Sequence, residues 1–220
     1  VQTLLLAKAN TELLDKDGLT AVQCAEEDWE MDLDMEREFE GAWGDMDDDG
    51  RLDAYLCRDG RNQLWLQQDS GWVESSDEVV GGGDLLTVDG AMFDADHDGD
   101  LDVFCVNSDG PDALLNNNRN GTFAEVAAEV FGAGGEGSRQ VLVADLDRDR
   151  DVDLIVVGAT GNQVYINDRL WDWRIADSTF DAFRREAVGA VVAGDVEAMG
   201  KPKLCTTGSV GLQWWDGGSG

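Results

Sequence analysis

Histidine, proline and basic residues are scarce in this sequence of 220 residues. It has one histidine, His97, and two prolines, and its 16 lysines and arginines stand against 47 aspartates and glutamates, a formal net charge of -31. With one histidine, a Ser-His-Asp triad, a histidine-rich zinc site and a histidine acid–base pair are ruled out or strained. A surface of this sign repels phosphate backbones and anionic lipids, so we expect neither nucleic acid nor a membrane surface as partner.

Long hydrophobic runs are also absent. No stretch of about eighteen apolar residues occurs, so we expect no transmembrane helix and no membrane insertion. Hydrophobic residues still make up 42% of the chain, which is a globular composition for one all-β domain of this length. The chain starts at Val1 without an initiator methionine or a leader peptide, so we expect a processed product or an excised piece.

An aspartate-rich segment of nine residues recurs along the chain. It reads DMDDDGRLD at 45–53, DADHDGDLD at 94–102 and DLDRDRDVD at 145–153. A degenerate copy, DVEAMGKPK, lies at 195–203. The segments begin at 45, 94, 145 and 195, so their spacings are 49, 51 and 50 residues. A fixed period of this size is the signature of a repeat architecture. We call these segments the first to fourth loops and number their residues from position 1 to position 9.

Short apolar segments surround every loop in the same order. One precedes and one follows each loop, as 41–44 and 54–57 do in the first repeat, and two more follow after turns rich in Gly, Asn and Asp. Apolar runs bounded by turn formers predict strands, and four short strands repeated radially make a propeller blade. The sequence therefore predicts an all-β fold, a β-propeller of four-stranded antiparallel blades.

The predicted propeller covers residues 1–216, and residues 217–220 read as a linker. Partial blades are expected at 1–25 and 188–216, and complete blades at about 40–75, 89–127 and 140–176. This makes about four and a half blades, so we expect an incomplete ring that further blades of a longer chain, or a partner chain, complete. The acidic segment 26–40 is expected to be a solvated connection between blades or a strap that binds a partner.

The spacing of the aspartates suits a calcium ion. Carboxylates at positions 1, 3 and 5 of a tight loop point toward one centre, position 7 would add its backbone carbonyl, and position 9 closes the cage. Calcium takes six to eight oxygen ligands at 2.3–2.6 Å. The predicted ligands are Asp45, Asp47, Asp49, Arg51 and Asp53 in the first loop, Asp94, Asp96, Asp98, Asp100 and Asp102 in the second, and Asp145, Asp147, Asp149, Asp151 and Asp153 in the third.

An EF-hand would open with the same pattern, but it needs a bidentate glutamate at position 12. Position 12 is Leu56, Cys105 or Val156 here, so an EF-hand is excluded. Position 6 is expected to be left-handed, which costs a residue other than glycine roughly 1–2 kcal/mol, so Arg150 predicts weaker binding in the third loop. In the fourth loop Met199, Lys201 and Lys203 replace ligands, so we expect no calcium there.

Cysteine and tryptophan add two further expectations. Cys24, Cys57, Cys105 and Cys205 form no metal-binding cluster; buried free thiols are favoured, and disulfides are the alternative. Cys57 and Cys105 are expected on opposite blade faces and therefore not paired with each other. Trp43, Trp65 and Trp72 are expected in the core between blades. Trp171, Trp173, Trp214 and Trp215 are less well explained by a core and are candidates for a ligand groove or an uncovered face.

A loop of this kind within a strand-loop-strand repeat resembles the FG-GAP/VCBS repeats of integrin-α-like propellers. The loops at 45–53 and 94–102 match the D-x-D-x-D-G-x-x-D core fully. More narrowly, the segments 41–50 and 114–128 are similar to repeats of ASPIC/UnbV-type proteins, which include the cartilage acidic proteins. The resemblance implies a secreted, extracellular or periplasmic propeller, often seven-bladed, whose calcium ions make loops rigid on one face.

From these observations we expect a calcium-binding propeller for adhesion or recognition of a protein or glycan, without catalysis. Two alternatives stay open: a scaffold in a secreted enzyme that acts on polysaccharides, and an architectural subunit. A pocket of convergent polar groups on the face opposite the loops would favour the enzyme. Exposed tryptophans would favour ligand binding, and a bare apolar edge would favour assembly.

Overall fold

The computed structural model describes residues 41–75, 83–119, 122–126, 131, 137–186, 188–199, 202–208 and 211–216. These residues form four antiparallel sheets, in which the strands follow one another in chain order. The partial blade expected at 1–25, the acidic segment 26–40, Cys24 and the tail 217–220 lie outside the described residues.

Each sheet is one blade, and the first three have four strands. Blade 1 holds β1 (Gly41–Gly44), β2 (Asp53–Leu56), β3 (Gln63–Gln68) and β4 (Gly71–Glu74); blade 2 holds β5 (Thr87–Phe93), β6 (Asp102–Asn107), β7 (Ala113–Asn117) and β8 (Phe123–Glu125). Blade 3 holds β9 (Ser138–Ala144), β10 (Asp153–Gly158), β11 (Asn162–Asn167) and β12 (Trp173–Ile175); blade 4 holds β13 (Val188–Gly194), β14 (Lys203–Gly208) and β15 (Gly211–Asp216). The predicted all-β fold of antiparallel blades is confirmed.

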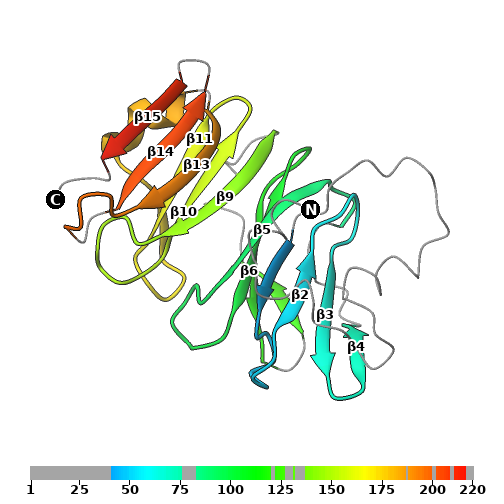
Figure 1. Cartoon of the computed structure of the whole chain (residues 1–220). Coiled ribbons are helices and arrows are strands. Elements are labelled where there is room, and N and C mark those ends of the chain that lie inside the picture. The colour runs from blue at the N-terminus through cyan, green and yellow to red at the C-terminus, as the bar shows by residue number, and fades with distance from the viewer. Residues whose placement is uncertain are drawn as a thin grey trace.

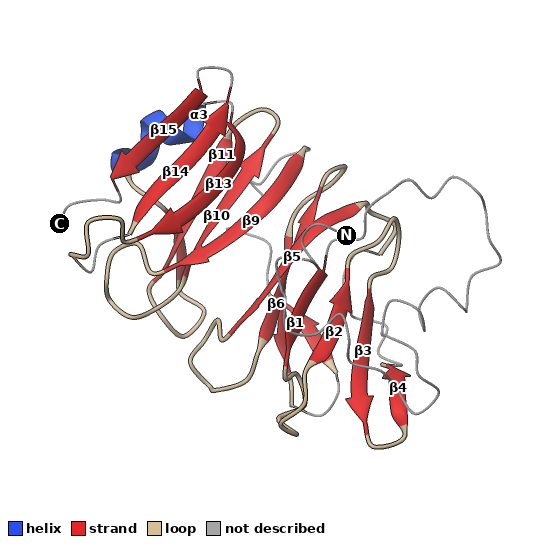
Figure 2. Ribbon diagram, in the orientation of Figure 1, coloured by secondary structure: helices blue, strands red, loops and turns tan. Residues whose placement is uncertain are grey.

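The first strands of successive blades lie side by side. β1 contacts β5, β5 contacts β9 and β9 contacts β13, while the last strands lie at the periphery, as β4 does (Figures 1 and 2). Side chains of these inner strands also bond to the next blade: the Asp89 carboxylate accepts from Val141 N at 2.8 Å, and the Gln140 amide oxygen accepts from Val191 N at 3.0 Å. This is the radial order of a propeller, and the described blades follow an arc without closing a ring.

Alternation along the second strands builds the core between blades. Successive strand residues point to opposite faces, so each blade supplies apolar side chains to both neighbours. Tyr55 and Cys57 meet Val103 and Cys105 between blades 1 and 2, Phe104 and Val106 meet Leu154 and Val156 between blades 2 and 3, and Ile155 and Val157 meet Leu204 between blades 3 and 4. Burial of these faces is the main force that holds the blades together.

The cysteine thiols follow the same alternation. Cys57 and Cys105 do point to opposite faces of equivalent strands, but because the blades stack, both enter the interface between blades 1 and 2. They are separate buried thiols, and Cys105 Sγ lies 2.9 Å from the Tyr55 hydroxyl. Burial raises the pKa of Cys105 to about 12, so this thiol is unreactive at neutral pH.

The burial of the tryptophans agrees only partly with the prediction. Trp65 is buried and packs near half-buried Trp43 and Trp72 on the face of blade 1 that points away from blade 2. Trp173 is also buried, in edge contact with Phe131 at 5.5 Å, so its assignment to a groove was wrong: it belongs to the core. Of the candidates for an uncovered face, Trp214 is 53% exposed.

A short helical segment replaces a plain connection between blades 3 and 4. A 3-10 helix, η2 (Ser178–Phe180), is capped by the Asp177 carboxylate and continues into α3 (Asp181–Arg185). Phe180 and Phe183 anchor it in the core between these blades. No helix among the described residues is long and apolar enough to cross a membrane.

Candidate metal centres

The three aspartate loops close equivalent hairpins at one end of the blades. Position 9 begins the second strand and pairs with the last residue of the first strand: Asp53 with Gly44, Asp102 with Phe93, and Asp153 with Ala144. The hairpin register therefore fixes where each loop starts and ends, and side chains at equivalent positions lie in equivalent places in every blade.

The aspartate at position 9 is fully buried and holds the loop to its blade. One oxygen of Asp102 accepts from Ala95 N at 2.9 Å and the other accepts from Asn117 N at 2.9 Å. Asp53 and Asp153 make the same two bonds. Burial raises the pKa of Asp53 to about 6 and those of Asp102 and Asp153 to about 7, against the opposing effect of the two backbone bonds.

Positions 1, 3 and 9 converge in all three loops. One carboxylate oxygen from each of Asp45, Asp47 and Asp53 lies within 4.8 Å of the others, and the same holds for Asp94, Asp96 and Asp102 and for Asp145, Asp147 and Asp153. Burial is the largest cause that raises the pKa of the aspartate at position 3 in each loop. Repulsion from neighbouring carboxylates raises this pKa further, and hydrogen bonds from backbone N–H groups lower it. Ionising three such carboxylates together is unfavourable unless a cation lies between them.

The second loop gives the clearest test of whether a hard cation fits. Asp94 Oδ1 is buried and has no hydrogen-bond partner, although Asp94 Oδ2 accepts from Gly99 N at 3.1 Å. An unpartnered buried carboxylate oxygen beside two other carboxylates is the environment that a bound cation satisfies. The donors are all oxygen atoms, which is the set that calcium prefers.

Position 5 does not join these groups. In the first loop the Asp49 carboxylate is bound by the Arg51 guanidinium, and in the second Asp98 lies 3.2 Å from Arg119. Asp149 of the third loop instead groups with Asp147 and with Asp168, which follows β11, and their ligand atoms lie within 4.8 Å of one another. The structure thus brings together three of the four predicted side-chain ligands of each loop.

Position 7 forms an ion pair that reverses its charges between repeats. Asp100 and Asp151 occupy this position in the second and third loops, and they are bound by Arg119 at 2.8 Å and Arg169 at 2.6 Å. In the first loop the position holds Arg51, whose Nη1 lies 3.2 Å from Asp69, the residue equivalent to Arg119. Arg119 and Arg169 were missed by the prediction, but their fixed spacing from the aspartates is a signal that could have found them.

Two residues of each loop have positive φ angles. The predicted left-handed position 6 is confirmed, with φ of 85° for Gly50, 91° for Gly99 and 81° for Arg150. Position 4, which carried no prediction, is left-handed too, at 58° in Asp48 and 67° in His97. The Arg150 backbone is therefore held in the conformation that disfavours a side chain.

Asn117 and Asn167 link the second and third loops to the loop of the preceding blade. Asn117 Nδ2 donates to the carbonyl of Met46 at 2.9 Å, and Asn167 Nδ2 donates to the carbonyl of Ala95 at 3.0 Å. The backbone N–H groups of the same asparagines bind the position-9 aspartates. Their spacing of fifty residues, with an arginine two residues later in both cases, is the sequence signal that was missed.

His97 also joins neighbouring loops. Its Nε2 atom lies 2.5 Å from Asp151 Oδ1, so a side chain at position 4 of the second loop contacts position 7 of the third. His97 is not among the converging groups of the described loops, and its non-ligating position stays a prediction.

The fourth loop has the same frame with fewer carboxylates, since only Asp195 at position 1 and Glu197 at position 3 are acidic. β13 pairs with β14 from Gly194 and Lys203 onward, and Ala198 at position 4 has a φ of 53°. The Lys203 ammonium at position 9 lies 2.7 Å from Glu197 at position 3, so a positive charge replaces the carboxylate of position 9 and pairs with one of the two acids of this loop.

The FG-GAP-like repeat pattern matches residues 45–105 and 94–156, about half of the chain, and these segments contain all three aspartate loops. The chain belongs to the FG-GAP-like repeat family. No curated protein matches the sequence. The narrower similarity of this FG-GAP chain to ASPIC/UnbV-type proteins remains a prediction.

One similar solved structure is that of an Agrocybe aegerita lectin, described as specifically recognising non-reducing terminal N-acetylglucosamine. The TM-score is 0.55 at 19% sequence identity, over 80% of this chain and 48% of the lectin. The similarity at this identity concerns the fold, and the FG-GAP chain spans about half the length of the lectin.

Proposed function

We propose that this FG-GAP chain is a secreted, calcium-stabilised propeller module that recognises glycans and has no catalytic activity of its own. The observation that supports it most is the convergence of carboxylates at positions 1, 3 and 9 within 4.8 Å in three loops. Calcium would bind there to the described aspartates of the first, second and third loops, weakest in the third because of Arg150.

The proposed role of calcium is structural. The position-9 aspartate already joins each loop to the third strand of its own blade, and Asn117 and Asn167 join the second and third loops to the preceding blade. A cation that neutralises the loop carboxylates would therefore hold both a hairpin and an interface between blades. Extracellular modules bind calcium with Kd values of about 10⁻⁴–10⁻³ M, which suits a secreted or periplasmic protein.

Glycan rather than nucleic-acid recognition is favoured by the charge of -31 and by the fold similarity to a lectin. The single histidine is engaged by Asp151, which supports a role without acid–base catalysis. Protein ligands remain the alternative within the same class of recognition modules.

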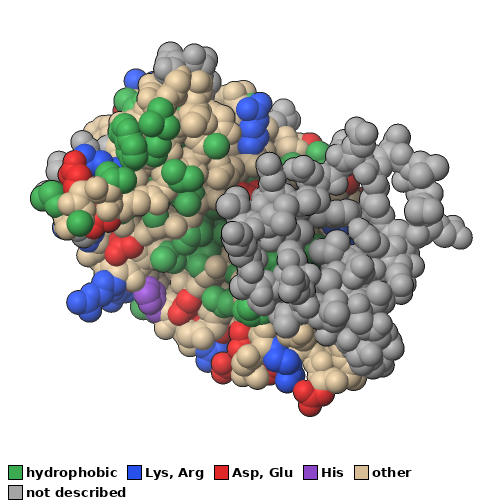
Figure 3. Space-filling model, viewed as in Figure 1, with side chains coloured by type: hydrophobic (Ala, Val, Ile, Leu, Met, Phe, Trp, Pro, Cys, Tyr) green, Lys and Arg blue, Asp and Glu red, His purple; other side chains and the backbone are tan. Residues whose placement is uncertain are grey.

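Assembly is a second candidate function, supported by one surface. Val192, Leu212 and Trp214 of blade 4 are 59%, 61% and 53% exposed, and hydrophobic side chains gather over β13–β15 (Figure 3). Blades 1 to 3 bury their corresponding faces against the next blade, so a further blade, from a longer chain or a partner, has the chemistry that fits this face.

Two measurements test the proposal. Calcium titration calorimetry is expected to show binding to the chain, and a glycan array probed with and without calcium is expected to show selective binding that a chelator weakens. A chain that binds calcium but no glycan would refute recognition of glycans. A chain that binds glycans equally well in chelator would refute the structural role of calcium.

A further inference from the structure

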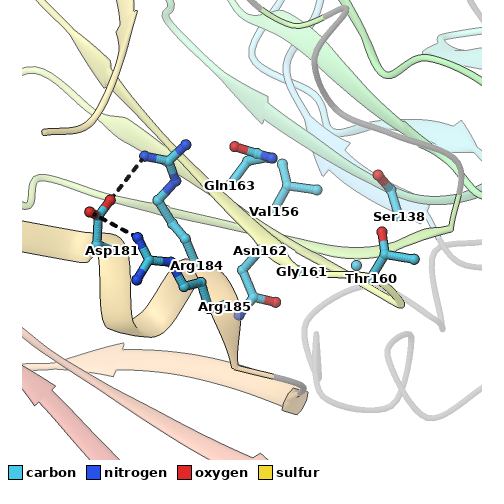
Figure 4. Close-up of a pocket in the computed structure, with 10 residues that line it drawn as sticks. Ser138, Val156, Thr160, Gly161, Asn162, Gln163, Asp181, Arg184 and Arg185 are labelled. Atoms are coloured by element: carbon cyan, nitrogen blue, oxygen red, sulfur yellow. Dashed lines mark hydrogen bonds and ion pairs between the residues drawn. The ribbon is translucent and has the colours of Figure 1, made fainter. Parts of the chain in front are cut away.

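A polar pocket lies at the end of blade 3 opposite the aspartate loop. Its cavity of about 310 Å³ is formed by the start of β9, the turn between β10 and β11, and α3 (Figure 4). The lining side chains used below are Asn162, Gln163, Asp181, Arg184 and Arg185. A cavity of this size is at the lower end of the range for small-molecule sites.

Asn162 gives the pocket a fixed hydrogen-bond acceptor. The residue is 1% exposed, and its Nδ2 donates to the carbonyls of Phe183 at 2.7 Å and Glu186 at 3.0 Å. These two bonds determine the orientation of the amide and leave Oδ1 without a hydrogen-bond partner. The equivalent oxygens of Asn62 and Asp112 are satisfied by backbone N–H groups of Arg58 and Asn107, so the unpartnered oxygen distinguishes blade 3.

Gln163 adds a second acceptor, since its Oε1 atom is also buried without a partner. A buried amide oxygen that makes no hydrogen bond is unfavourable, because it has lost its bonds to water without replacing them. Two such oxygens beside one cavity therefore point to a ligand that carries hydrogen-bond donors.

Arg184 and Arg185 add donors of positive charge. Both guanidiniums approach the Asp181 carboxylate, at 3.6 Å and 3.3 Å, as the dashed lines in Figure 4 show. One carboxylate for two guanidiniums leaves a net positive charge here, on a chain whose overall charge is -31. Arginine binds carboxylates with two parallel N–H donors, so this pair suits an anionic group.

Close approach of the turn to the helix fixes the shape of the site. A Cβ atom on Gly161 would lie 2.8 Å from the Arg184 carbonyl, and the φ of Gly161 is 152°, so glycine is needed here. The turn that carries the amide oxygens and the helix that carries the arginines therefore pack directly against each other, which fixes their relative positions.

We infer that this pocket binds a sugar residue that carries a carboxylate, a uronic acid of an extracellular polysaccharide. The hydroxyl groups of the sugar donate to Asn162 and Gln163, and its carboxylate binds Arg184 and Arg185. The inference rests on the proposed glycan recognition and adds its site and its class of ligand. A polar pocket opposite the loops would also suit an enzyme, but its one lining carboxylate, Asp181, is engaged by both arginines, so a free acid–base pair is absent from its described lining.

The test uses the full calcium-loaded chain, a galacturonic acid trisaccharide and the neutral galactose trisaccharide, in titration calorimetry. Arg185→Gln removes a charge from a side chain that is 79% exposed, so the fold is expected to persist. Gln163→Leu removes the second acceptor at similar size. Arg174→Gln is the matched control, because Arg174 is an exposed arginine of the same blade, paired with Asp168.

The expected result is that the acidic trisaccharide binds, that Arg185→Gln weakens it about tenfold and Gln163→Leu about threefold, and that Arg174→Gln changes nothing. Equal binding of the neutral trisaccharide would overturn the assignment of a carboxylate ligand. Glycan binding that ignores both pocket variants would overturn the site while leaving the proposed function intact. Binding of calcium without either trisaccharide would also overturn the inference, and the glycan array then decides whether recognition of glycans fails with it.

Discussion

The third and fourth loops have the same backbone frame and opposite chemistry. Both connect paired first and second strands, and both have a left-handed residue at position 4, Arg148 in one and Ala198 in the other. The third loop places carboxylates at positions 1, 3 and 9, whereas the fourth sets the Lys203 ammonium against Glu197. The fourth loop keeps only Asp195 of these aspartates, and its carboxylate accepts from Met199 N at 2.9 Å. A propeller hairpin of this shape therefore forms without the aspartates of positions 5 and 9, so their presence in the first three loops needs another explanation, which a bound cation supplies.

Substitution of position 9 should give the largest difference in stability between an aspartate loop and the fourth loop. Asp102→Ala leaves the buried N–H groups of Ala95 and Asn117 without acceptors, and we expect the free energy of unfolding to fall by roughly 3–5 kcal/mol. Lys203→Ala removes one partly exposed ion pair from the fourth loop and should cost less than about 1 kcal/mol. Denaturant unfolding of both variants measures the difference. Equal losses would show that the position-9 side chains contribute equally to the stability of the two loops.

A buried aspartate away from the loops sharpens the comparison. Asp112 occupies the position of Asn62 and Asn162, accepts from Asn107 N and Ser138 Oγ, and has its pKa raised by burial to about 6. Because the folded state binds this proton more tightly than the unfolded state, the stabilisation is complete below about pH 4 and is lost as the pH rises through 6.

Asp112→Asn should therefore raise stability by roughly 1–3 kcal/mol at pH 8 and leave it nearly unchanged at pH 4. Unfolding midpoints across this pH range, in chelator, provide the measurement. A variant that is equally destabilised at both pH values would mean that Asp112 stabilises the fold as an anion, as the loop aspartates are proposed to do with calcium.

The fourth loop can be converted toward the others. Met199→Asp with Lys203→Asp restores carboxylates at positions 5 and 9 beside Asp195, Glu197 and Gly200. We expect one additional calcium in titration calorimetry and a gain of about 1.4 kcal/mol when calcium is tenfold above its Kd, with a loss of stability in chelator. The absence of an added site would show that the frame of this loop differs from the others in more than its ligands.

The smallest effect concerns position 6. Arg150→Gly should relieve a left-handed side-chain conformation and stabilise the third loop by about 0.5–1 kcal/mol, with tighter calcium binding there. Gly50→Ala is the complementary variant, because a Cβ on Gly50 meets nothing within 4 Å and so adds conformational strain alone; it should weaken calcium binding in the first loop. If Arg150→Gly and Gly50→Ala shifted calcium affinity in the same direction, this explanation would be contradicted.

Much of this arrangement could be predicted because the repeat carries it locally. Alternating apolar runs and turn residues define the blades, and the left-handed position 6 follows from the glycines of the first two loops. The bonds from Asn117 and Asn167 and the ion pair of Arg119 with Asp100 join segments about twenty to seventy residues apart, so strand patterns do not reveal them. The pocket beside Asn162 depends on the backbone approach of α3, which no repeat position encodes.

The central claim is that calcium in the aspartate loops stabilises the folded propeller. Its most direct test is denaturant unfolding of the chain in millimolar calcium and in chelator, with Asp47→Ala and Asp96→Ala measured alongside. We expect calcium to add on the order of 2–4 kcal/mol over three sites, and each variant to lose part of that gain. Unfolding curves that coincide in calcium and chelator would contradict the claim and leave the aspartate loops as solvated turns.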